Sequence, residues 1–218
     1  MDIFQSEIFA NMSYIVASML FIFGLKQLGS PETAQRGNLI SASGMFLAVL
    51  VTLINSQIIS YEWLAAGLIL GVIVGASAAS LVKMTSMPEL VALFNGFGGI
   101  ASLLVGSAEY LGANSLGLIS LTAIFLTLII GGVTFSGSLV AYGKLSEILP
   151  GRQITFLGQR IVLIAIFILS LVLGAQLIFG FELFQVWNPT YSFSFLILSA
   201  LIIGLLITLP IGGADMPV

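Results

Sequence analysis

The chain has 218 residues, of which 59% are hydrophobic and 7% are charged, and its formal net charge is −3. A soluble domain carries about 25% charged residues, so this composition excludes an ordinary soluble enzyme and a disordered chain. The six basic residues form no cluster, which excludes a nucleic-acid binder, because proteins hold the phosphate backbone through clustered Lys and Arg. The composition predicts an integral membrane protein.

The sequence contains neither cysteine nor histidine. Without cysteine there is no disulfide, thiol nucleophile or iron–sulfur cluster. Without histidine the chain lacks the commonest metal ligand and the side chain that normally titrates near neutral pH. We therefore predict no metal site, and any proton handling must use carboxylates, hydroxyls, water or a partner.

Long charge-free stretches recur along the chain, and a membrane-spanning helix needs about 20 apolar residues. Backbone groups in lipid must be satisfied within their own segment, which favours helices, and the polar–apolar alternation of a barrel is missing. The sequence predicts an all-α polytopic bundle, residues 1–218, with seven transmembrane helices near residues 8–28, 37–60, 63–82, 87–110, 117–142, 161–181 and 192–211.

The basic residues indicate the orientation of this bundle. They fall only in the odd-numbered loops between the predicted helices, at Lys26, Arg36, Lys83, Lys144, Arg152 and Arg160. Positively charged loops stay on the cytoplasmic side. The pattern predicts an outside N-terminus and odd loops that face the cytoplasm or the mitochondrial matrix.

The third predicted helix carries Gly67, Gly71, Gly75 and Ala79 at four-residue spacing. Small residues at this spacing let two helices approach closely. We interpret the stripe as a packing ridge.

The fourth predicted helix places Asn95, Gly99, Ser102 and Gly106 on one face. This face is either a packing surface, in which Asn95 bonds a neighbouring helix, or the wall of a hydrated path. Glu89 lies near the start of the same helix. Its carboxylate either complements the positive end of the helix dipole or serves as a proton-entry or docking residue.

The fifth predicted helix carries Thr134 and Ser138 four residues apart, with Gly131 and Tyr142 on the same face. Helical hydroxyls often bond back to their own backbone carbonyls; the alternative is a hydrated pore wall. Asn95 and Ser138 lie at similar depth from the inner surface. They could therefore face each other.

The chain ends with a Gly-Gly turn followed by Asp215 and Pro217. An Asp followed by Pro two residues later is typical of the cap and first turn of a helix. We expect the start of an eighth helix here. Asp215 either caps that helix or meets a soluble partner at the inner face.

Five strings stand out along the chain: YIVASMLFIFGL at 14–25, ETAQRGN at 32–38, MTSMPELVALFNGFGG at 84–99, VTFSGSLVAYGKL at 133–145 and PIGGADMPV at 210–218. Together they resemble one family, the proton-translocating NAD(P) transhydrogenase beta subunit in its N-terminal membrane domain. The resemblance spans nearly the whole chain. It implies the membrane component of an enzyme that couples hydride transfer between NAD(H) and NADP(H) to proton translocation.

The resemblance also implies roles for individual residues. Asn95 matches a position that is His in some members, where it is the protonatable group of the channel, and Ser138 matches a channel-lining hydroxyl. With Ser102 and Thr134 they form the expected proton path. Asp215 and Glu89 match carboxylates near the inner mouth, where the membrane domain couples to the NADP(H)-binding domain.

Family beta subunits continue with further helices and a soluble NADP(H)-binding domain, which this sequence lacks. The chain is therefore interpreted as truncated before that domain or as one piece of a split subunit, with no catalytic, cofactor or metal site of its own. NAD(H) and NADP(H) are expected in the full complex. Expected partners are alpha-type subunits, the NADP(H)-binding domain and the lipid bilayer, in a dimer of the complex.

The expected location is the bacterial cytoplasmic (inner) membrane, ahead of the mitochondrial inner membrane. The alternative function is a stand-alone small transporter or channel that shares only the helical architecture. A structural scaffold is a further alternative. Dependence on an alpha-type subunit distinguishes the transhydrogenase component from a transporter, which works alone.

Overall fold

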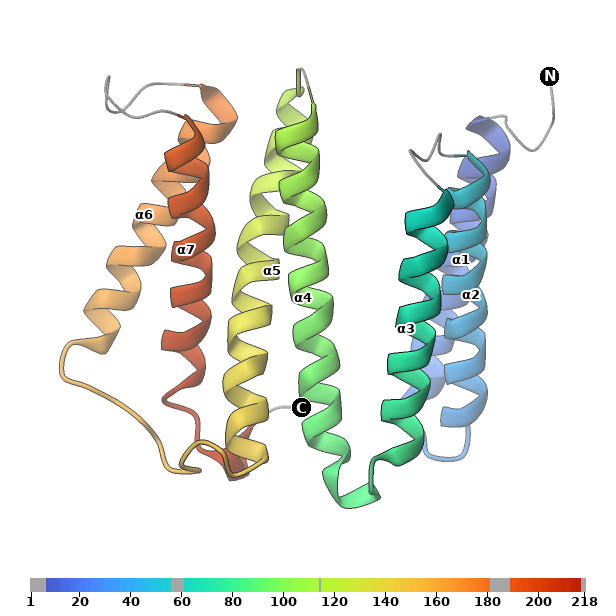
Figure 1. Ribbon diagram of the computed structural model, residues 1–218, viewed down its shortest axis with the longest axis horizontal. Coiled ribbons are helices and arrows are strands. Elements are labelled where there is room, and N and C mark those ends of the chain that lie inside the picture. The colour runs from blue at the N-terminus through green and yellow to red at the C-terminus, as the bar shows by residue number, and fades with distance from the viewer. Residues whose placement is uncertain (1–6, 56–60, 114, 181–188, 217–218) are drawn as a thin grey trace. The chain divides into compact units, whose positions relative to one another are not determined.

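The computed structural model describes residues 7–55, 61–113, 115–180 and 189–216, and within them the chain is helical without any strand (Figure 1). Seven helices are long and apolar enough to cross a membrane, as the sequence predicted. They are α1 (Glu7–Leu28), α2 (Ala34–Asn55), α3 (Tyr61–Leu81), α4 (Met87–Gly112), α5 (Leu118–Leu145), α6 (Gln159–Phe179) and α7 (Pro189–Thr208). Two short 3₁₀ turns, Met84–Ser86 (η2) and Gly213–Asp215 (η3), precede α4 and follow α7.

The ends of α7 and the C-terminal end of α5 differ from the predicted ones. α7 begins and ends three residues early, because proline fits the first turn at Pro189, whereas Pro210 disfavours helical geometry in the residue before it. α5 continues to Leu145, which places Lys144 in the last helical turn and not in the loop. A basic residue there complements the negative end of the helix dipole. The ends predicted at 60 and 181 lie outside the described residues.

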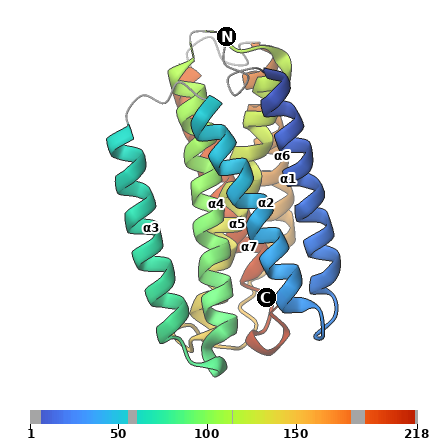
Figure 2. The same cartoon turned by 90° about the vertical axis from the view of Figure 1, so that its right-hand side faces the viewer.

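Residues 1–75 form one compact unit, in which α1 and α2 run side by side (Figures 1 and 2). Glycines bring the two backbones together: a Cβ on Gly24 would lie 2.7 Å from the carbonyl oxygen of Gly37, and the converse distance is also 2.7 Å. The hydroxyls of Tyr14 and Thr52 share a 2.9 Å hydrogen bond between the two helices. Small residues and one polar contact therefore hold this pair together.

Residues 76–218 form the second unit, in which α5 packs between α4 and α7, and α6 packs on α7. A buried cluster from all four helices forms its core: Leu103, Ile124, Leu128, Leu173, Phe193 and Leu196. Tyr110 stacks on Phe193 with ring centroids 4.5 Å apart. This core fixes the two faces of α5, one toward α4 and one toward α7.

The glycine ridge predicted on α3 has no neighbour in the described part of the chain. A Cβ on Gly67, Gly71 or Gly75 would meet nothing within 4 Å, and α3 contains no buried residue. The ridge stays a prediction.

Candidate functional site

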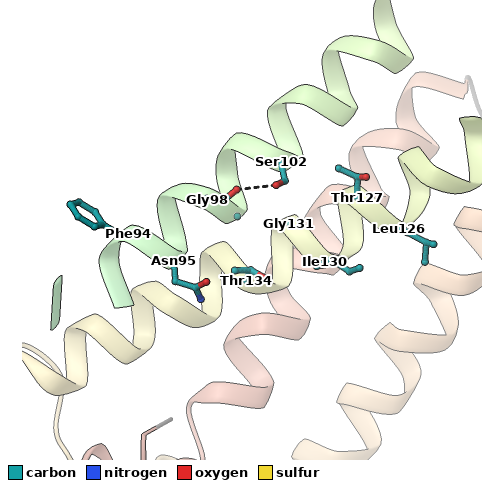
Figure 3. A pocket seen from close by; sticks show the side chains of 10 residues that line it. Phe94, Asn95, Gly98, Ser102, Leu126, Thr127, Ile130, Gly131 and Thr134 are labelled. Atoms are coloured by element: carbon teal, nitrogen blue, oxygen red, sulfur yellow. Dashed lines mark hydrogen bonds between the residues drawn. The ribbon is translucent and has the colours of Figure 1, made fainter. Parts of the chain in front are cut away.

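An open cavity of about 520 Å³ with both polar and apolar lining lies along the contact between α4 and α5 (Figure 3). Asn95 points from α4 toward α5, whereas the neighbouring Phe94 points away. The lining combines one amide, three hydroxyls, three glycines and three apolar side chains, and none of these side chains is charged; it consists of Phe94, Asn95, Gly98, Gly99, Ser102, Leu126, Thr127, Ile130, Gly131 and Thr134.

Close backbone contact creates this arrangement. A Cβ on Gly99 would lie 2.7 Å from the amide nitrogen of Phe135 and 2.8 Å from the carbonyl oxygen of Gly131. A Cβ on Gly131 would lie 2.7 Å from the carbonyl oxygen of Gly99. These distances are too short for any side chain. Glycines at both positions therefore let α4 and α5 approach closely enough for short polar side chains to meet.

Asn95 and Ser138 face each other, as expected from their similar distance along the predicted helices from the inner membrane surface. The Asn95 Nδ2 donates a hydrogen bond of 2.8 Å to the Ser138 Oγ. Ser138 is buried, and its hydroxyl proton remains available as a donor because Oγ acts here as the acceptor. The pair can therefore pass hydrogen bonds onward, although neither side chain titrates in the physiological range.

The other cavity hydroxyls differ in their bonding. Ser102 Oγ donates to the carbonyl oxygen of Gly98 at 3.0 Å, and Thr127 Oγ1 donates to that of Ala123 at 2.8 Å. Such bonds are common for helical hydroxyls, yet each oxygen still has lone pairs that can accept from water. Thr134 makes no side-chain hydrogen bond to another described residue, so its hydroxyl is free to bind water.

The two carboxylates of the predicted coupling region lie away from this cavity. Glu89 is half-buried in the first turn of α4, and Asp215 is exposed in η3. The adjacent Met216 is buried against Ala92 of α4, together with Val140 and Ala141 of α5. η3 itself packs on α5, so Met216 and η3 place this segment beside the end of α5 that follows Ser138. Pro217, predicted for the first turn of an eighth helix, lies outside the described residues.

Sequence reasoning missed two residues of this region. Thr127 lies seven residues before Thr134, and its helical spacing would have revealed it as part of the cavity stripe. Lys144 was read only as an orientation signal. It is buried, and its ammonium donates to backbone carbonyls of three positions, Arg152, Leu209 and Ile211. No local pattern marks this role, because the acceptors are main-chain atoms distant in sequence.

Comparison with known proteins assigns this architecture to a family. The family model described as "NAD(P) transhydrogenase beta subunit" matches residues 10–218. Two proteins named "NAD(P) transhydrogenase subunit beta" from Rhodospirillum rubrum, one of them from a named strain, are each 37% identical over 214 residues. These matches cover 94% of this chain and 45% of each relative. The chain thus spans about half the length of the curated relatives it matches.

Proposed function

The chain belongs to the NAD(P) transhydrogenase beta subunit family, and we propose on this basis that it forms the membrane part of an enzyme coupling hydride transfer between NAD(H) and NADP(H) to proton translocation. The observation that carries the proton-translocation part is the Asn95–Ser138 hydrogen bond beside a cavity whose lining includes three hydroxyls. Polar groups within an apolar membrane are costly unless they are hydrated or bonded. Hydration of this cavity would give protons a path.

In this proposal Asn95, Ser138, Ser102 and Thr134 hold a chain of water molecules, and Thr127 extends the chain. None of these side chains takes up a proton near neutral pH. The proton-carrying group then comes from water, from helices of an alpha-type subunit or from a group elsewhere in the complex. Because hydroxyls both donate and accept, they relay protons without becoming charged.

The distribution of basic residues supports an orientation with the N-terminus outside. The start of α4, the end of α5 and η3 then lie on the cytoplasmic side. Asp215 and Glu89 would face the soluble NADP(H)-binding domain there. Met216 is extended after η3, so an eighth helix would begin after this residue. We place the complex in a bacterial cytoplasmic membrane, as a dimer containing alpha-type subunits, with NAD(H) and NADP(H) bound outside this chain.

The decisive experiment is reconstitution of the complete enzyme in proteoliposomes. Hydride transfer is followed by nucleotide absorbance and proton uptake by a pH-sensitive dye, with and without the alpha-type subunit. The proposal expects both activities only in the assembled complex, each abolished when this chain is omitted. Proton movement by the chain alone, without nucleotides or partner, would instead support the stand-alone transporter.

Replacing Asp215 with asparagine is expected to lower proton-coupled hydride transfer by about tenfold, which corresponds to about 1.4 kcal/mol of activation free energy. The change removes the charge of an exposed side chain while keeping its size, so the amount of enzyme in the membrane should not change. Glu109→Gln is the matched control, because it neutralises an exposed carboxylate at the other end of α4. Equal rates for the two variants would contradict a coupling role for Asp215.

A further inference from the structure

Lys144 is a buried cation, with 3% of its surface exposed at the end of α5. Its Nζ donates hydrogen bonds to the carbonyl oxygens of Leu209 at 2.5 Å, Ile211 at 2.6 Å and Arg152 at 3.4 Å. An ammonium has three donors, so the three carbonyls satisfy it completely. Among the described residues no carboxylate pairs with it.

Such a site tolerates little movement. A buried charge is costly unless it is fully hydrogen-bonded, and here only carbonyl dipoles offset the charge. Leu209 and Ile211 follow the end of α7, where the last carbonyls of a helix lack intrahelical partners. If the segment after α7 moved away, the ammonium would lose the carbonyls of Leu209 and Ile211 and keep only that of Arg152. Such a movement would leave the buried charge with too few acceptors.

Two further bonds tie the α5–α6 connection to the segment after α7. The amide of Ile154 donates to the carbonyl of Leu209 at 3.1 Å, and the amide of Gly213 donates to that of Gly151 at 2.8 Å. In Figure 1 the α5–α6 connection and the segment after α7 meet beside the end of α5. We call residues 209–216, which include η3 and Asp215, the post-α7 segment. α5 holds this segment through the Lys144 hydrogen bonds and through the packing of Met216 with Val140 and Ala141.

The same helix also carries the cavity. Ser138 precedes Lys144 by six residues, which is about 9 Å along the helix axis. One rigid helix thus links the Asn95–Ser138 hydrogen bond to the ammonium, and the ammonium to the backbone of the segment that carries Asp215. A displacement of α5 caused by a change in the cavity would reach Asp215 through Lys144.

We propose that Lys144 is a positioning residue that latches the post-α7 segment to α5 and thereby transmits changes in the proton path to Asp215. This inference rests on the proposed transhydrogenase function. It adds to that function the residue that couples the proton path to Asp215. Lys144 touches neither proton nor nucleotide; it acts through the backbone that it holds.

The test uses the complete reconstituted enzyme and the variant Lys144→Met, which keeps the apolar stem and removes all three donors. The first readout is the mobility of a nitroxide attached to Ala214→Cys, an exposed position in a chain without cysteine, after cysteines of the other subunits have been replaced. The second is the stimulation of hydride transfer by an imposed proton gradient. Lys83→Met is the control, because it removes an exposed lysine from the segment before α4.

We expect Lys144→Met to raise nitroxide mobility and to lower the gradient stimulation about fivefold, a common size for coupling between sites, while hydride transfer without a gradient is retained. Lys144→Arg keeps the charge and hydrogen-bond donors, so it should partly restore both the low nitroxide mobility and the gradient stimulation. Unchanged mobility would overturn the proposal. Increased nitroxide mobility with normal gradient stimulation would also overturn it. A parallel fall of all activities would overturn it as well, because such a fall indicates only a structural role for Lys144.

If Lys144→Met does not accumulate in the membrane, Lys144→Gln and Lys144→Arg give the same two readouts with milder changes. Failure of the wider function is recognised separately. Wild-type gradient stimulation in both Ser138→Ala and Asp215→Asn would reject the proposed proton path and coupling region, whereas the nitroxide readout would still decide whether Lys144 holds the post-α7 segment.

Discussion

Replacing Ser138 with alanine is expected to lower proton-coupled hydride transfer and proton uptake by roughly tenfold. A positioned proton-transfer group typically contributes about 100-fold or more to a rate, and water entering the cavity should replace part of the lost hydroxyl. The change removes the acceptor for Asn95 Nδ2 and one donor of the proposed water chain. Proteoliposomes of the complete enzyme, assayed for both activities, provide the measurement.

Ser136→Ala is the matched control for this prediction. Ser136 is also a buried serine of α5, but its hydroxyl bonds back to Gly132 at 3.0 Å and it lies against Gly204 of α7. It therefore lies on the side of α5 away from the cavity. Equal activities for Ser136→Ala and Ser138→Ala would contradict the placement of the proton path between α4 and α5.

The partner residue supplies an internal check. Asn95→Leu is expected to reduce proton flux as Ser138→Ala does, because it places an apolar side chain in the cavity and removes the donor of the same hydrogen bond. Residues of one network are not additive, so the double variant should lose little more than the worse single variant. Normal proton flux in Asn95→Leu would favour the alternative in which this face of α4 serves only for packing.

Replacing Gly99 with alanine is expected to destabilise the α4–α5 pair by about 1–3 kcal/mol, the usual cost of overpacking. The new methyl group would lie 2.7 Å from the amide nitrogen of Phe135 and 2.8 Å from the carbonyl oxygen of Gly131. Both are backbone atoms, so no side chain can rotate away to relieve the contact and the helices must separate. Denaturant unfolding of the purified protein in detergent measures the effect.

Gly98→Ala is the adjacent control, because a Cβ at this position meets nothing within 4 Å. Alanine is favoured over glycine within a helix by about 0.5–1 kcal/mol, so Gly98→Ala should be neutral or stabilising. We therefore expect Gly98→Ala to be at least as stable as the wild type, and Gly99→Ala to be the least stable of the three proteins. A Gly99→Ala protein as stable as the Gly98→Ala protein would show that α4 and α5 do not approach as closely as described.

Much of this site followed from helical periodicity. The seven-residue separation of Asn95 and Ser102 put them on one side of α4, and the shared depth of Asn95 and Ser138 suggested their contact. Lys144 could not be found in the same way. Its acceptors are carbonyl oxygens at Arg152, Leu209 and Ile211, and every residue has a carbonyl, so no residue type marks the acceptors. The sequence also placed the end of α5 too early, at residue 142, because the charged Lys144 was taken to lie outside the helix that in fact ends at Leu145.

The sequence by itself determined that the chain forms seven apolar helices, because a helix satisfies its backbone hydrogen bonds within its own segment. Tertiary structure decided which face of each helix meets a neighbour. Gly98 and Gly99 are neighbours in the sequence, yet in the described structure Gly99 lies against the backbone of α5 at Gly131, whereas a Cβ on Gly98 would meet nothing within 4 Å. The physical reason is that lipid tails are as apolar as leucine, so burying apolar side chains between helices does not favour one helix face over another. The fit of small residues and the satisfaction of a few polar groups then select the helix partners.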